Sequence, residues 1–212
     1  MEVDLRFRHP FSLIIAGPSK AGKTQFSCRL LENIDEMVTV KPEVIYFCYT
    51  EMQPAYERIA RIPNVQMTEG APDLATLKSD SRKKLILLDD MMQESSKDNT
   101  LTTLFTRSSH HWDMSCIFLT QNIFYKNSRD SRLSAQYIVL FKNPADRLTV
   151  QTLGRQMFPN KGKFMVDAFA DATKQPYGYL MLDLTQTTPD ELRVRTNIFP
   201  GETTTVYLPY KK

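Results

Sequence analysis

The sequence is poor in cysteine and has no long apolar run. Its three cysteines, Cys28, Cys48 and Cys116, form no CxxC pair and no cysteine–histidine spacing typical of a metal site. Their number is odd and each lies in an apolar segment, which predicts buried, reduced thiols in an intracellular protein. No apolar stretch approaches the roughly 18–20 residues of a membrane span. The first residues also lack the pattern of a secretory signal. We therefore expect no membrane partner.

A strong charge imbalance is also missing. The formal net charge is +3 and the isoelectric point is about 8.7. Domains that bind nucleic acid through phosphate contacts often have an isoelectric point above about 9. The charge of this chain therefore permits contact with nucleic acid but does not predict it. The hydrophobic fraction of 42% in 212 residues suffices for one core. We expect a single domain over residues 1–212, with a core at about 7–184 and a C-terminal hairpin and tail at 177–212.

Short apolar strands alternate with amphipathic helices along the chain. This order predicts an α/β fold with a central, mainly parallel sheet that is flanked by helices. Strands are expected at residues 11–16, 43–49, 84–89, 115–120 and 136–141. Helices are expected at 22–33, 54–61, 72–78 and 97–109, and from the Asn143-Pro144 cap to about residue 157. Apolar and polar residues alternate within segments 177–184 and 192–198. This pattern predicts a pair of antiparallel strands added at one edge of the sheet.

The most specific motif follows the first expected strand. Residues 17–24 read GPSKAGKT and match G-x-x-x-x-G-K-[ST] in full, between a strand and a helix. Glycines let backbone N–H groups turn toward phosphates, and the helix start adds its positive dipole end. Lys23 would reach the β- and γ-phosphates, and the Thr24 hydroxyl would bind Mg²⁺. The predicted ligands are ATP and Mg²⁺, bound by Gly17, Pro18, Ser19, Lys20, Ala21, Gly22, Lys23, Thr24 and Gln25.

Two carboxylates follow a buried strand about 65 residues later. Residues 84–90 read KLILLDD. We expect Asp89 to hold the same Mg²⁺ through a water, from the strand next to the phosphate loop. Asp90 would polarise the attacking water, which favours a hydrolase over a nucleotide kinase. The alternative is that Asp90 only caps the next segment.

Further candidates lie around the fourth expected strand. Gln121 ends it at the carboxyl edge, where it would hydrogen-bond the γ-phosphate or the water; the alternative is an ordinary turn amide. Arg107 is the first candidate for an arginine that acts on the active site of a neighbouring subunit, and Arg132 is the second. For each arginine, the alternative is a solvated surface group.

Together these motifs carry a family resemblance. The stretches GPSKAGKT, LILLDDM, RSSHHWDMSCIFLTQNIF and YIVLFKNPADR resemble the packaging ATPases of the FtsK/HerA superfamily. The resemblance is greatest to the poxvirus-type DNA-packaging ATPases of Polinton/Maverick elements, adintoviruses and virophages. The C-terminal YGYLMLDL and LRVRTNIFPGE are also similar to that group, so the resemblance covers about residues 7–202.

This resemblance implies a RecA-like ASCE fold and a hexameric or pentameric ring that pumps double-stranded DNA into a capsid. It implies a location in the infected host cell, with capsid vertex proteins as partners. Lys23 and Thr24 match the phosphate and Mg²⁺ ligands, Asp89 the Mg²⁺ carboxylate and Asp90 the catalytic one. Gln121 matches the sensor glutamine, and Arg107 the arginine that acts in trans. Many members have Glu where this chain has Asp90, and the shorter side chain retracts that carboxylate by one methylene.

Three functions are consistent with these observations. The first is an ATP-hydrolysing motor that moves double-stranded DNA, with residues 124–130 or 161–163 as candidate phosphate contacts. The second is a nucleotide kinase in which residues 129–132 form a basic lid. The third is a scaffold that binds ATP for assembly without hydrolysing it.

Overall fold

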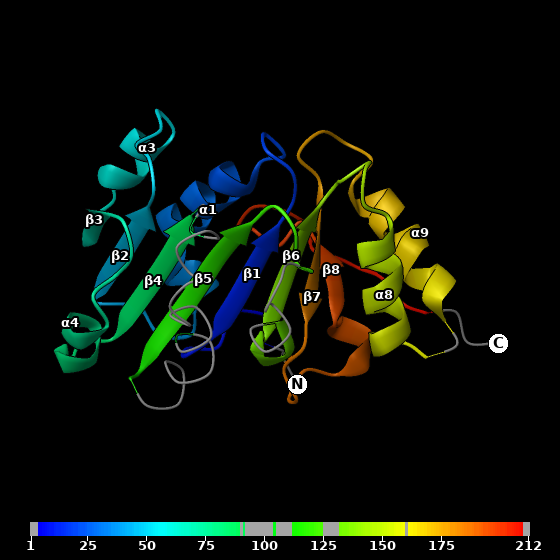
Figure 1. The fold of residues 1–212 in the computed structure, drawn as a ribbon. Coiled ribbons are helices and arrows are strands. Elements are labelled where there is room, and N and C mark those ends of the chain that lie inside the picture. Colours follow the sequence, from blue (N-terminus) through cyan, green and yellow to red (C-terminus); the bar gives the residue numbers. More distant parts are fainter. Residues whose placement is uncertain are drawn as a thin grey trace.

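The computed structural model describes residues 4–89, 91, 104, 112–124, 132–159 and 161–209. Within these residues lies a nine-stranded sheet of order β3-β2-β4-β5-β1-β6-β7-β8-β9 (Figure 1). The strands from β3 to β6 in this order are parallel, and β7, β8 and β9 continue the sheet in antiparallel pairs. This confirms the predicted α/β architecture and its antiparallel edge.

The strands are β1 (Ser12–Ala16), β2 (Val44–Tyr49), β3 (Val65–Glu69), β4 (Lys84–Asp89), β5 (Met114–Thr120), β6 (Tyr137–Phe141), β7 (Tyr179–Asp183), β8 (Val194–Thr196) and β9 (Thr205–Val206). The helices are α1 (Lys23–Glu32), α2 (Ile34–Met37), α3 (Tyr56–Ala60), α4 (Leu74–Ser79), α8 (Leu148–Met157) and α9 (Gly162–Ala172), with a 3₁₀ turn at Asp190–Leu192. None of the helices in the described part of the chain has the length and apolar character needed to span a bilayer.

Helices cover both faces of the sheet. In β1, Leu13 and Ile15 belong to the apolar cluster that contains Phe26 and Leu30 of α1. Ile14 and Ala16 of the same strand belong to the second cluster, with residues of α8 and α9. All residues of β1, β4, β5 and β6 are buried, because a parallel sheet between helix layers has no solvent-facing side. This explains the uninterrupted apolar strands of the sequence.

The three cysteines are free thiols inside the core, as expected. Burial raises the pKa of Cys48 to about 12 and also raises the pKa of Cys28 and Cys116. At neutral pH these groups are protonated and behave as small apolar side chains.

One expected helix begins later than its cap signal indicates. Asn143 does not cap a helix, because its side-chain oxygen accepts a hydrogen bond from the backbone N–H of Ala145 and closes a turn (3.1 Å). Helix α8 begins only at Leu148, where the Asp146 carboxylate accepts from the N–H of Thr149 (3.1 Å). Strand β3 and helix α9 were not predicted. The expected helix at 97–109 lies outside the described residues, apart from Leu104.

Candidate functional site

The segment that follows β1 forms a curled loop at the carboxyl ends of the parallel strands (Figure 1). Its first N–H, on Gly17, donates to the carbonyl of Thr120 in β5 (3.1 Å), and the N–H of Ala21 donates to the carbonyl of Pro18 (3.2 Å). The φ angles of Lys20 (62°) and Gly22 (111°) are positive. Positive φ angles curl the backbone here, as they do in the concave nests that bind anions in other proteins.

The two loop glycines are needed for different reasons. Gly22 has a positive φ that favours glycine, as the sequence predicts for a bending position. Gly17 has no positive φ, but a Cβ there would lie 2.6 Å from the Cβ of Phe141 in β6. Gly17 is therefore needed for close packing of the loop against the neighbouring strand, and not for backbone bending as expected.

The Lys23 ammonium lies inside the curl of the loop. Its Nζ donates to the carbonyl oxygens of Gly17 (2.7 Å) and Pro18 (3.0 Å). Lys23 starts α1, with Gly22 as the N-cap residue, so this cation and the positive end of the helix lie together. A polyphosphate in the loop would meet both.

Thr24 and Asp89 meet across the sheet edge, as the sequence predicts. The hydroxyl of Thr24 is 3.5 Å from Oδ2 of Asp89, which is 6% exposed. However, β4 is not the strand next to β1, because β5 lies between them. The prediction of adjacent strands is wrong, since sequence order does not fix the order of strands in a parallel sheet.

Sequence reasoning missed Tyr56, the third member of this group. Its buried hydroxyl donates to Oδ2 of Asp89 (2.9 Å) from the start of α3. Nothing in the local sequence marks this tyrosine, since only the packing of α3 against the sheet brings it to Asp89. A hydrogen bond of this kind fixes the orientation of a carboxylate.

These oxygen atoms suit Mg²⁺. Ligands of an octahedral Mg²⁺ lie about 2.1 Å from the ion, so adjacent ligands are about 3 Å apart. The separation of 3.5 Å between the Thr24 hydroxyl and the Asp89 carboxylate fits two adjacent ligands if the two groups move slightly closer together. It also fits one group in direct contact with the ion and the other in contact through a water. The described residues contain no cluster of three or more His, Cys, Asp or Glu side chains suited to a metal. Phosphate and water oxygens would have to complete the coordination.

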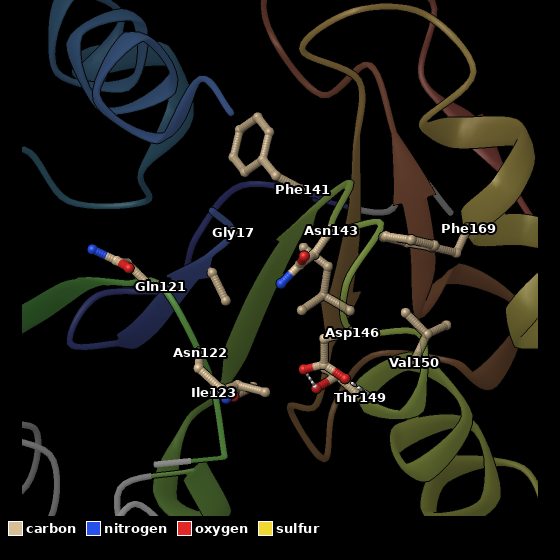
Figure 2. A pocket seen from close by; sticks show the side chains of 12 residues that line it. Gly17, Gln121, Asn122, Ile123, Phe141, Asn143, Asp146, Thr149, Val150 and Phe169 are labelled. Atoms are coloured by element: carbon tan, nitrogen blue, oxygen red, sulfur yellow. Dashed lines mark hydrogen bonds between the residues drawn. The ribbon is translucent and has the colours of Figure 1, made fainter. Parts of the chain in front are cut away.

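Gln121 follows β5 between the two halves of the site. In the sheet register Ala16 pairs with Thr120 and Asp89 pairs with Leu119, so Gln121 extends just beyond the edge between Gly17 and Asp89. Its side chain is exposed, and Figure 2 shows its amide pointing away from a small cleft beside the loop. Gly17, Asn122, Asn143 and Asp146 are among the residues that line this cleft. The predicted location is thus consistent with a role at the γ-phosphate.

Two predicted site residues, Asp90 and Arg107, lie outside the described residues. Arg132 lies within the described residues. Its guanidinium donates to the side chain of Gln156 in α8 (3.0 Å) and lies 4.6 Å from the ring centre of Phe124. These contacts hold the Arg132 side chain between α8 and the ring of Phe124.

By sequence, no protein-family model matches the chain, and no curated protein is significantly similar to it. By structure, it is similar to the genome packaging NTPase B204 from Sulfolobus turreted icosahedral virus 2, solved in complex with ATP-gammaS. That match has a TM-score of 0.51 and 11% identity, and covers 94% of this chain and 97% of B204.

Two further structures, of EccC and of EssC, are similar to the same extent. The Thermomonospora curvata EccC structure, of ATPases 2 and 3 with a signal sequence peptide, matches with a TM-score of 0.50 and 11% identity over 96% of this chain. The cytoplasmic domain of EssC matches with a TM-score of 0.51 and 13% identity over 96%. This chain spans 37% of the EccC chain and 40% of the EssC chain.

These similarities and the sheet order define the class of fold. The chain has the RecA-like α/β fold of P-loop ATPases, with its phosphate loop between β1 and α1. At this level of identity the comparison supports the fold, and the chemistry has to be argued from the site.

Proposed function

We propose that this protein is an ATP-hydrolysing motor that assembles as a ring and moves double-stranded DNA into a viral capsid. The observation that carries the ATPase part is the meeting of Thr24 with Asp89 beside a curled phosphate loop. Two hard oxygen donors next to an anion-binding loop suit a triphosphate with its Mg²⁺. The transport part is supported by the family resemblance of the motifs and by the structural likeness to a viral packaging NTPase over nearly the full length of both chains.

In this proposal each residue has a defined task. Lys23 exchanges its bonds to the loop carbonyls for bonds to the β- and γ-phosphates. Thr24 and Asp89 would hold Mg²⁺, and the bound ion would neutralise charge on the phosphate oxygens. Tyr56 keeps the Asp89 carboxylate turned toward Thr24. Asp90 polarises the water, Gln121 contacts the γ-phosphate, and Arg107 of a neighbouring subunit stabilises charge in the transition state.

ATP turnover of the purified protein, with and without double-stranded DNA, tests the function. Stimulation of hydrolysis by DNA is the expected result. Transfer of phosphate to a nucleotide acceptor would show a kinase, and nucleotide binding without turnover would show a scaffold; either result contradicts the motor. The ring is tested by the mass of the assembly in the presence of ATP.

Replacing Tyr56 with phenylalanine is expected to weaken Mg²⁺ binding about tenfold. The change removes only the hydroxyl that donates to Asp89, and loss of a hydrogen bond behind a metal ligand costs on the order of 10–100-fold in affinity or activity. The measurement is the Mg²⁺ concentration for half-maximal ATPase activity. Tyr46→Phe removes a comparable hydroxyl, which donates to Asp80 away from the site (2.8 Å), and is the control. An equal change in both variants would contradict the role of Tyr56.

The described candidates for DNA contact lie at the start of α9. Lys161 and Lys163 are exposed there, and Lys163 shares a surface groove with the exposed Arg155 of α8. The other candidate, the loop at 124–130, lies outside the described residues except for Phe124.

The double variant Lys161→Ala/Lys163→Ala is expected to weaken DNA binding and to leave basal ATPase activity intact. Each lost phosphate contact should reduce the slope of log affinity against log salt by about 0.9. DNA affinity measured over a salt series checks this. The exposed Lys78 of α4 supplies the control, Lys78→Ala. An unchanged salt slope in the double variant would remove this surface from the DNA path.

A further inference from the structure

A second group of residues lies at the phosphate loop, and its members outside the loop have no role in the mechanism above. They line an open pocket with a volume of about 260 Å³. This volume is slightly below about 300 Å³, where the usual range of ligand sites begins. Its lining consists of Lys20, Ala21, Lys142, Thr173, Lys174, Gln175, Pro176, Tyr177 and Gly178. The pocket thus combines the phosphate loop with the end of β6 and with the turn at 173–178 between α9 and β7. Three of its described lining residues are lysines and none is acidic.

Tyr177 is held in this pocket in an unusual conformation. Its φ angle is +63°, although bulky residues rarely adopt the left-handed region, and the residue is 69% exposed. The ring nevertheless lies against the phosphate loop, since a Cβ on Gly22 would be 3.1 Å from Cδ1 of Tyr177. An exposed aromatic ring that gains little from burial and is kept in a strained conformation indicates a surface held ready for a ligand.

The turn around Tyr177 is fixed by its neighbours. The N–H of Gly178 donates to the carbonyl of Gln175 (3.1 Å), and the hydroxyl of Thr173 donates to the carbonyl of Phe169 (2.7 Å). A Cβ on Gly178 would overlap the carbonyl oxygen of Ala172, so the turn closes tightly onto the end of α9. The backbone that carries the Tyr177 ring is therefore held by these contacts.

The sheet order decides which part of a nucleotide reaches this pocket. Asp89 ends β4, two strands from β1 on one side, and Tyr177 precedes β7, two strands from β1 on the other. The end of β4 and the start of β7 lie at the edge of the sheet that carries the phosphate loop (Figure 1). If Thr24 and Asp89 hold the metal-bound γ-end, a chain of phosphates that crosses the loop away from β4 brings the nucleoside to the side of β6 and β7.

We infer that the pocket at residues 173–178 binds the nucleoside part of the triphosphate, with the base stacked on the ring of Tyr177. The inference rests on the proposed ATPase function and names the base-binding part of the same site. Lys20, Lys142 and Lys174 provide positive charge on the side of the sugar and the α-phosphate. Every base has a π-face, so any base can stack on the ring. Tyr177 should therefore raise the affinity for nucleotides over that for inorganic triphosphate. It should discriminate much less between ATP and GTP.

The test compares ATP with inorganic tripolyphosphate, both with Mg²⁺, by calorimetry on the full chain. The variant Tyr177→Gly is expected to bind ATP about tenfold more weakly, the order expected for loss of one stacked base, with unchanged affinity for tripolyphosphate. Its melting temperature should equal or exceed that of the original chain, because glycine adopts positive φ without strain. Tyr177→Phe should bind ATP normally. Asn64→Gly, at another positive φ (65°) outside the pocket, is the control and should bind both ligands normally.

The results separate this inference from the proposed function. Unchanged ATP affinity in Tyr177→Gly, together with weakened binding of both ligands in Lys23→Ala, would overturn the base site and leave the phosphate site standing. Equal weakening of ATP and tripolyphosphate in Tyr177→Gly would also overturn it, because the tyrosine would then act on the phosphate loop. Binding of neither ligand to the original chain would overturn both proposals.

Discussion

Replacing Lys23 with alanine is expected to lower ATP hydrolysis by a factor on the order of 10²–10³, the effect of removing one pre-placed charge from a transition state. Lys23 is the cation inside the curl of the loop, and its contacts with two loop carbonyls already place it there. The variant should fold, since helix α1 loses one polar group at its first residue and keeps its buried apolar face. The measurement is steady-state phosphate release at saturating ATP and Mg²⁺.

The control for this variant is Lys41→Ala. Lys41 is an exposed lysine in a surface ion pair with Asp35 (2.7 Å), and such pairs contribute little to stability. Its turnover should match that of the original chain. Turnover in Lys23→Ala equal to that of the control would show that residues 17–24 do not bind the phosphates, and the ATPase proposal would be rejected.

The second large effect is expected for Asp89→Asn. The change keeps the shape of the side chain but removes the charge that would face Mg²⁺ beside Thr24. We expect hydrolysis to fall at least about 100-fold, as for loss of a strong electrostatic contact in the transition state. Raising the Mg²⁺ concentration should restore part of the activity. Nucleotide affinity in the absence of Mg²⁺ should fall little or rise, because a negative charge near the phosphates is lost.

A Mg²⁺ titration of the ATPase rate, combined with Tyr56→Phe, tests the arrangement further. If Tyr56 acts only by orienting Asp89, its removal should have little added effect in the Asp89→Asn variant, because residues in one network are not additive. Asp35→Asn, on the exposed surface, is the matched control. Full activity of Asp89→Asn at low Mg²⁺ would show that the metal lies elsewhere.

The predicted site and the structure agree best where the chemistry is local. A glycine-rich loop, a lysine and a threonine within eight residues suffice to define a phosphate loop, and the strand before it and the helix after it are both found. Strand β4 has the predicted bounds, since an apolar run that ends in a charged residue marks its own end. The start of α8 was not predicted correctly, because Asn143 closes a turn and does not cap the helix. Asparagine is common both in turns and at helix N-caps, and the local sequence does not distinguish these two roles.

The sequence by itself determined the α/β class and the strand–loop–helix unit that carries GPSKAGKT, because each depends on residue type and on spacing along the chain. Tertiary structure alone decided that β5 separates β1 from β4, that Tyr56 reaches Asp89, and that Tyr177 lies against Gly22. These contacts join residues 30 to 155 positions apart. Such contacts arise from how strands order themselves and helices pack, and no local pattern of residues encodes that arrangement.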